Sequence, residues 1–225
     1  MNDSHNQTYY ILDLDRTILN TDKAADLMRN AVSWHNTDLA SELAQRIEDY
    51  TLLGESFSIR DFIVERIGED GIAEIETKYN ELSAAVDVLN PGAQSLLDYL
   101  QTKPDAGVGI LTFGSPLGQA MKIHAAGLDV LPFLVTGETF KGQQISSWRR
   151  DDGLYQLPPE LGGGTTNQIV FVDDKPFSFK GLAADCRGYW VKSLYDAGNE
   201  KLPSYVQPVE NLKDIIALED TINQQ

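Results

Sequence analysis

The chain has 225 residues, 42% of them hydrophobic and 23% charged, which is enough apolar sequence for one large domain or for a domain that carries a smaller one. Its 34 acidic and 18 basic residues give a net charge of −16, which disfavours nucleic acid and anionic membranes as partners. With one cysteine, Cys186, and no signal-peptide pattern in the first eight residues, we expect a cytoplasmic protein without an internal disulfide.

Four or five short apolar runs predict the strands of a parallel sheet. The runs are nearly continuous rather than alternating, as in strands that are covered on both faces. They span residues 9–14, 108–113, 133–136, 169–172 and 189–191. Helical patterns lie between most of them: Asn90 and Pro91 begin one helix as its cap and first turn, and Gly127 ends another that starts at Pro116. This alternation predicts an α/β fold.

The segment 22–89, between the first and second predicted strands, contains no convincing strand. Four amphipathic patterns predict helices there, the third beginning at a Ser58 cap and ending at Gly68. With 15 acidic and 6 basic residues, the segment is acidic by itself. We predict that it is an all-helical subdomain inserted into the sheet domain. Residues 141–167, which are rich in proline and glycine, are predicted to form a long and mostly irregular excursion.

Polar side chains gather where the predicted strands end, which is where ligands bind to open parallel sheets. The candidates are Asp13, Asp15 and Thr17 after the first strand, Thr112 in the second, Lys141 after the third, and Asp173 and Asp174 after the fourth. Carboxylates from separate strands repel one another unless a cation lies between them. All-oxygen ligands favour Mg²⁺, which often bridges to a substrate phosphate. The sequence therefore predicts a site for a hard cation and a phosphoryl group.

Four segments of the chain, in this order, resemble the motifs of the haloacid dehalogenase (HAD) superfamily. They are DLDRT, LTFG, a lysine and VFVDD. The resemblance covers the whole chain and implies a Rossmann-like parallel-sheet core, the HAD fold, formed by residues 1–21 and 90–225. The helical segment 22–89 is similar to the family's C1-type cap.

The resemblance implies the following roles for the acidic residues. Asp13 would be the nucleophile that forms an aspartyl-phosphate, and Asp15 the general acid and then the base. Mg²⁺ would be held by the Asp13 carboxylate, the Asp15 backbone carbonyl and one carboxylate of the Asp173-Asp174 pair. We expect Asp174 to be the direct ligand and Asp173 to support it.

The other motif residues would bind the phosphoryl group. The resemblance implies that the Thr112 hydroxyl and the backbone N–H groups near Phe113 and Gly114 hydrogen-bond its oxygen atoms. A lysine would neutralise charge on the nucleophile and the phosphate. Lys141, which precedes a glycine, is the first choice, and Lys122 in the preceding helical pattern is the alternative.

The second acidic residue of the first motif narrows the expected chemistry. Breaking a carbon–halogen bond needs no protonation of an alkoxide, and the family's dehalogenases lack an aspartate at the position of Asp15. Arg16 stands where many members have glycine. We therefore expect a Mg²⁺-dependent phosphatase for a small phosphorylated metabolite, with a phosphomutase or a non-catalytic protein of the same fold as alternatives. No feature of the sequence indicates an oligomeric state.

Overall fold

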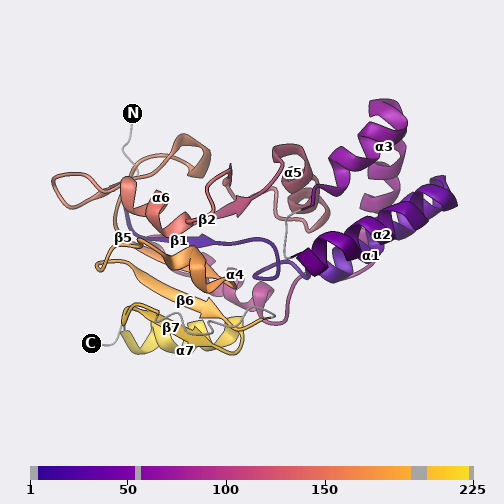
Figure 1. Cartoon of the computed structure of the whole chain (residues 1–225). Coiled ribbons are helices and arrows are strands. Elements are labelled where there is room, and N and C mark those ends of the chain that lie inside the picture. The colour runs from indigo at the N-terminus through magenta and orange to yellow at the C-terminus, as the bar shows by residue number, and fades with distance from the viewer. Residues whose placement is uncertain (1–4, 54–56, 194–201, 223–225) are drawn as a thin grey trace. The chain divides into compact units, whose positions relative to one another are not determined.

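The computed structural model describes residues 5–53, 57–193 and 202–222 of the chain. Strands and helices alternate over most of its length, with a block of helices after the first strand (Figure 1). The elements in chain order are β1 (His5–Leu12), α1 (Thr21–His35), α2 (Thr37–Leu53), α3 (Ile59–Ala84), α4 (Ala93–Gln101), β2 (Ala106–Phe113), α5 (Pro116–Ala125), β3 (Phe133–Thr136), α6 (Lys141–Ser147), β4 (Tyr155–Gln156), the 3₁₀ helix η1 (Pro159–Leu161), β5 (Thr165–Asp173), the 3₁₀ helix η2 (Pro176–Phe179), β6 (Arg187–Val191), β7 (Val206–Val209) and α7 (Leu212–Ile222).

Within the part of the chain that the structure describes, the sheet has seven strands, and β1 lies near its centre. The strand order is β3-β2-β1-β5-β6-β7, with β4 paired antiparallel to β5. Parallel pairing joins β2, β1, β5, β6 and β7. This confirms the predicted α/β class with a Rossmann-like parallel sheet. From β1 the chain builds the sheet in one direction through β2 and β3, and later in the other direction through β5, β6 and β7. The order therefore reverses between β1 and β5, which is where ligands bind in folds of this type.

Alternate residues of β1 pack on opposite faces of the sheet. Tyr9 and Ile11 are buried in a hydrophobic cluster that includes Phe171 of β5 and Ile145 of α6. Tyr10, between them, donates a hydrogen bond from its hydroxyl to Glu219 of α7. Helix α6 thus covers one face, and α7, which packs against α4, covers the other (Figure 1). Two-sided cover explains why the strand sequences are continuously apolar.

The helical segment follows its sequence signals closely. The Ser58 hydroxyl accepts the backbone N–H of Asp61 and caps α3, as predicted. Gly68 interrupts the same helix with φ 74° and ψ 177°, a backbone conformation that glycine adopts without steric cost. Residues 59–84 are therefore two helical stretches that meet at a kink, which confirms the predicted end of a helix at Gly68.

The chain divides into two compact units. The first consists of Met1–Ile18, Leu89–Thr112 and Leu131–Gln225, and it contains the sheet. The second consists of Leu19–Val88 and Phe113–Val130, in which α5 packs against α3. The predicted division into a core of residues 1–21 and 90–225 and a cap of residues 22–89 stays a prediction.

Two local predictions were wrong. Asn90 does not cap α4, which begins at Ala93 after Gly92; its side-chain amide instead donates to the backbone carbonyls of Arg16 and Thr17, both at 2.8 Å. A tertiary hydrogen bond has replaced the local cap that the sequence favoured. The segment 141–167 is not mostly irregular, because it contains α6, β4, η1 and the first residues of β5.

None of the predicted strands corresponds to the edge strand β7. This strand is four residues long and contains Pro208, which lacks the N–H that a central strand needs. Proline is tolerated here because β7 ends the sheet and pairs on one side with β6.

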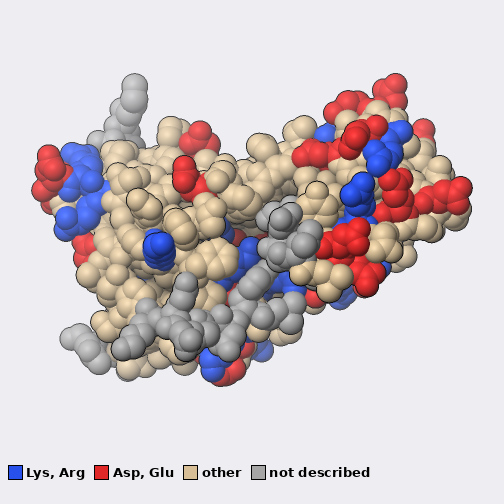
Figure 2. Space-filling model, in the orientation of Figure 1, with Lys and Arg blue, Asp and Glu red and all other residues tan. Residues whose placement is uncertain are grey.

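The surface of the helices α1, α2 and α3 carries many acidic side chains (Figure 2). Some of these acidic side chains pair with basic residues, as Glu42 of α2 does with Arg66 of α3 at 2.7 Å.

Within the described residues, none of the helices combines the length and the apolar character that crossing a membrane would require.

Candidate functional site

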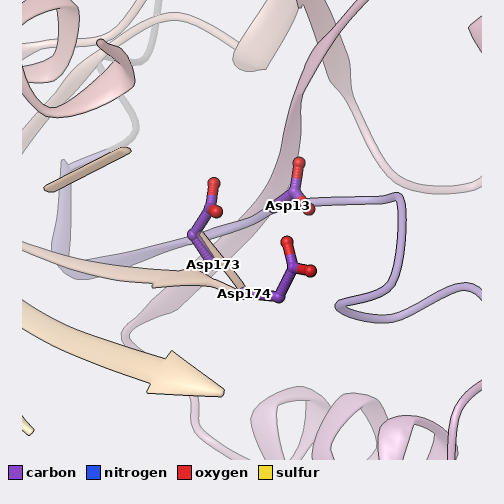
Figure 3. A group of neighbouring side chains, drawn as sticks. All are labelled: Asp13, Asp173 and Asp174. Carbon is purple, nitrogen blue, oxygen red and sulfur yellow. The ribbon is translucent and has the colours of Figure 1, made fainter. Parts of the chain in front are cut away.

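Three carboxylates meet at the carboxyl ends of β1 and β5. The register pairs Leu12 with Val172, so the residues that follow, Asp13 and Asp173, lie side by side. The backbone N–H of Asp13 donates to the carbonyl of Val172 at 2.9 Å and extends this pairing. Asp13, Asp173 and Asp174 each offer a ligand atom, and these atoms lie within 4.8 Å of one another (Figure 3).

Burial makes this cluster electrostatically costly. Asp13 is 4% exposed, and Asp173 and Asp174 are 0% exposed. Burial raises the pKa of Asp174 to about 8, with further contributions from the negative charges of Asp13 and Asp173. Burial likewise raises the pKa of Asp13 to about 6, although the positive charge of Lys141 opposes the shift. Carboxylates that lie this close together and are this deeply buried are stable in their ionised form only when positive charge lies beside them.

Lys141 supplies part of that charge. It is the first residue of α6 and is buried. Its ammonium group donates to Asp173 Oδ2 at 2.8 Å and to Asp13 Oδ1. Burial alone would lower the pKa of Lys141, but the two carboxylates outweigh it and raise the pKa above its usual value. Of the two candidate lysines, the structure thus brings Lys141 into the cluster, whereas Lys122 lies in the last turn of α5 in the second unit.

The two neighbouring aspartates are satisfied to different degrees. Both oxygen atoms of Asp173 accept hydrogen bonds, one from Lys141 and one from the backbone N–H of Lys175 at 2.8 Å. Asp174 Oδ2 accepts from the Ser193 hydroxyl at 2.8 Å, but its Oδ1 is buried and has no hydrogen-bond partner among the described residues. Asp174 Oδ1 is therefore the oxygen of this pair that remains for a cation.

Asp15 and its neighbours form a turn directly after β1. Asp15 is half-buried, and its charge contributes, after burial, Lys141 and Asp173, to the altered pKa of Asp13. Arg16 adopts φ 63°, a left-handed conformation that costs a non-glycine residue about 1–2 kcal/mol. The hydrogen bonds from Asn90 to the carbonyls of Arg16 and Thr17 hold this turn.

Thr17 orients Asp13 from the same turn. Its buried hydroxyl donates to Asp13 Oδ2 at 2.8 Å, while Lys141 contacts Oδ1. Both oxygen atoms of Asp13 are thus fixed in place. Thr17 was among the candidates predicted from the sequence, without a specific role, whereas Ser193 was not predicted. Ser193 follows the predicted strand 189–191 by two residues, so the same strand-end argument that selected the other candidates would have found it.

Thr112, near the end of β2, has a buried hydroxyl with no hydrogen-bond partner among the described residues, and it is 1% exposed. Leaving such a group unsatisfied costs about 1–3 kcal/mol. An oxygen-rich ligand at the end of β2 would remove this cost.

The turn that follows β2 is held by Gln119 of α5. Its side-chain amide donates to the Phe113 carbonyl at 2.7 Å. Gly114 has φ 144°, and a Cβ atom there would lie 2.8 Å from Gln119 Nε2. The backbone conformation favours glycine at this position, and a Cβ atom there would also displace the Gln119 amide.

The donor set suits a divalent cation. Three carboxylates at one place, one of them with an unpartnered oxygen, form the kind of all-oxygen group that binds hard cations such as Mg²⁺. The cluster could therefore hold a metal ion.

Comparison with known proteins identifies the fold. No protein-family model and no curated protein sequence matches the chain. Among solved structures, a protein described as a haloacid dehalogenase-like hydrolase from Burkholderia xenovorans is 18% identical with a TM-score of 0.58, and the match covers 94% of this chain and 98% of that one. CbbY from Rhodobacter sphaeroides in complex with phosphate is 16% identical with a TM-score of 0.53, covering 93% and 96%. L-2-haloacid dehalogenase from Xanthobacter autotrophicus is 15% identical with a TM-score of 0.53, covering 96% and 98%.

These similarities show that the chain has the haloacid dehalogenase fold. The resemblance that the sequence motifs indicated is thereby confirmed for the fold. The assignment of residues 22–89 to a C1-type cap stays a prediction, as do the catalytic and metal-binding roles of the site residues.

The raised pKa values predict how the stability of the metal-free protein depends on pH. An acid whose folded pKa lies above its unfolded value of about 4 stabilises the fold below that pH and loses this contribution as the pH rises through the folded value. For Asp174 the loss runs to about pH 8. We therefore expect the melting temperature of Asp174→Asn minus that of wild type, both measured in a chelator, to increase from pH 5 to pH 8.

Thermal unfolding followed by circular dichroism measures this difference. Asp98→Asn, on the exposed face of α4, is the control and should follow wild type at every pH. A constant difference between Asp174→Asn and wild type over this range would contradict the expected ionisation of Asp174.

Proposed function

We propose that the protein is a Mg²⁺-dependent phosphomonoester hydrolase that acts on a small phosphorylated metabolite through an aspartyl-phosphate on Asp13. The observation that carries this proposal is the buried cluster of Asp13, Asp173 and Asp174 with the Lys141 ammonium group among them. The helical segment 22–89 is proposed to select the leaving group and to exclude water during the reaction.

The cation would be held by the carboxylates of Asp13 and Asp174 and by the backbone carbonyl of Asp15. The unpartnered Asp174 Oδ1 supports this assignment, since a buried carboxylate oxygen without a donor is suited to a metal. When bound, Mg²⁺ supplies positive charge that attracts the substrate phosphate and stabilises the transition state.

Asp13 would act as the nucleophile. One of its carboxylate oxygens forms a bond to phosphorus while the bond from phosphorus to the leaving oxygen breaks, and Asp15 gives its proton to that oxygen. Asp15 then accepts a proton from a water molecule whose oxygen attacks the phosphorus. This second step releases inorganic phosphate and restores Asp13. The hydrogen bond from Thr17 and the contact with Lys141 support this role because they fix the orientation of the Asp13 carboxylate.

The phosphoryl oxygens would be bound by the Thr112 hydroxyl, by backbone N–H groups of Phe113 and Gly114, and by Lys141. The buried and unpartnered hydroxyl of Thr112 supports this part of the proposal. Preorganised donors of this type stabilise the charge that develops in the transition state.

Asp15 favours phosphate esters over halogenated acids as substrates. A halide leaves without being protonated, so dehalogenation does not require a second acid at this position. An alkoxide leaving group must be protonated, and an acid such as Asp15 can supply that proton. The same fold is known with phosphate bound, in CbbY from Rhodobacter sphaeroides, and in a haloacid dehalogenase, so the fold alone does not choose between these reactions. The choice rests on Asp15.

The first test is hydrolysis of p-nitrophenyl phosphate, with acetyl phosphate as a second and smaller substrate. We expect wild type to release product with Mg²⁺ and not in a chelator. Asp13→Asn should lower kcat by at least about 10³-fold, because the amide is a far weaker nucleophile. Asp98→Asn, which exchanges the same two groups on the exposed face of α4, should keep wild-type activity.

Turnover that survives in Asp13→Asn, or that proceeds equally in the chelator, would contradict the proposal. Conversion of a sugar monophosphate that depends on a bisphosphate activator would favour the phosphomutase alternative. Mg²⁺ binding without any modification of Asp13 by substrate would favour a non-catalytic protein.

A second prediction separates the two candidate lysines. Lys141→Ala removes the ammonium group that contacts Asp13 and Asp173, so kcat should fall by about 10²–10³-fold. Lys122→Ala should leave kcat within about twofold of wild type. Steady-state kinetics on the same substrate measures both variants, and circular dichroism verifies their folding. Full activity in Lys141→Ala with loss in Lys122→Ala would reverse the assignment.

A further inference from the structure

The neighbouring strand β6 holds Asp174 in place at two points. The register pairs Trp190 of β6 with Asp173 of β5, so the Trp190 side chain reaches the peptide that follows. Its indole N–H donates to the backbone carbonyl of Asp174 at 2.9 Å, and both groups are buried. Three residues further on, the Ser193 hydroxyl donates to Asp174 Oδ2 at 2.8 Å. One contact fixes the backbone of Asp174, and the other fixes its carboxylate.

These two contacts affect how many oxygen atoms of the Asp174 carboxylate can bind a cation. A free carboxylate can ligate through one oxygen or through both. Here Oδ2 is engaged by Ser193, and Oδ1 is buried without a partner among the described residues. The Trp190 indole holds the backbone carbonyl of Asp174 and so opposes a shift that would present both oxygens. Asp174 is therefore arranged to offer a single oxygen.

Single-oxygen ligation distinguishes between the two common hard cations. Mg²⁺ requires near-octahedral geometry with short bonds, and six single oxygens satisfy it. Ca²⁺ takes six to eight oxygens at longer distances and often uses carboxylates through both oxygens. A site whose carboxylate cannot become bidentate thus favours the smaller ion.

We propose that Ser193 and Trp190 are positioning residues that restrict Asp174 to one-oxygen ligation and so set a preference for Mg²⁺ over Ca²⁺. This inference rests on the proposed function, because it takes the carboxylate cluster to be a cation site. A purely structural role for the same two residues would change the stability of the fold and leave the ratio of the two metal affinities unchanged.

The test is calorimetric titration of metal-free protein with Mg²⁺ and, separately, with Ca²⁺. We expect wild type to bind Mg²⁺ more tightly than Ca²⁺. In Ser193→Ala the ratio of the two affinities should fall by about tenfold, within the range seen when groups that orient metal ligands are removed. Ser193→Thr keeps the hydroxyl and should restore the ratio. Ser147→Ala is the matched control, since its hydroxyl lies on the exposed part of α6 and donates to the Gln144 carbonyl.

Trp190→Phe provides a second variant, which keeps an aromatic ring in the hydrophobic cluster and removes the indole N–H. It should also lower the Mg²⁺ to Ca²⁺ ratio, and it keeps the inference testable if Ser193→Ala fails to fold. Wild type that binds Mg²⁺ together with variants whose ratios stay within twofold of it would overturn this inference and leave the proposed function intact. Wild type that binds neither ion would overturn the proposed function, and the inference with it.

Discussion

The repulsion among three buried carboxylates is the constraint on which the rest of the site depends. Asp13, Asp173 and Asp174 lie within 4.8 Å of one another, and the Lys141 ammonium group contacts the first two. Asp174 accepts a hydrogen bond from the Ser193 hydroxyl through its Oδ2 atom. The chain has thus balanced part of the negative charge and left one buried carboxylate oxygen unsatisfied, which is the arrangement expected of a cation site.

The topology of the sheet explains why this cluster forms where it does. The strand order reverses between β1 and β5. Asp13 follows β1, Asp173 is the last residue of β5, and Asp174 comes next. The turn after β1 adds Thr17, whose hydroxyl orients Asp13. Helix α6 begins at Lys141 and brings its side chain to the same place. The site is therefore built from element ends, each with its backbone held by the sheet or by a helix.

The sequence predicted those features that depend on local pattern and missed those that depend on tertiary contact. Asp13, Thr112 and Asp174 could be selected because apolar strands lead directly to them. Helix α6 was missed because KGQQISS has little helical periodicity, and the Asn90 cap was wrong because its amide serves a turn far away in sequence. The contacts of Ser193 and Trp190 with Asp174 require the register of β5 and β6, which no local pattern contains.

A crystal structure of the protein grown with Mg²⁺ and beryllium fluoride tests the central claim most directly. Beryllium fluoride forms a stable mimic of an aspartyl-phosphate, so it reports the nucleophile and the cation together. We predict that it is attached to Asp13, with the cation bound by the carboxylates of Asp13 and Asp174 and a fluoride atom within hydrogen-bond distance of Thr112 Oγ1. Unmodified Asp13 at saturating concentrations, or a cation bound away from Asp174, would contradict the account.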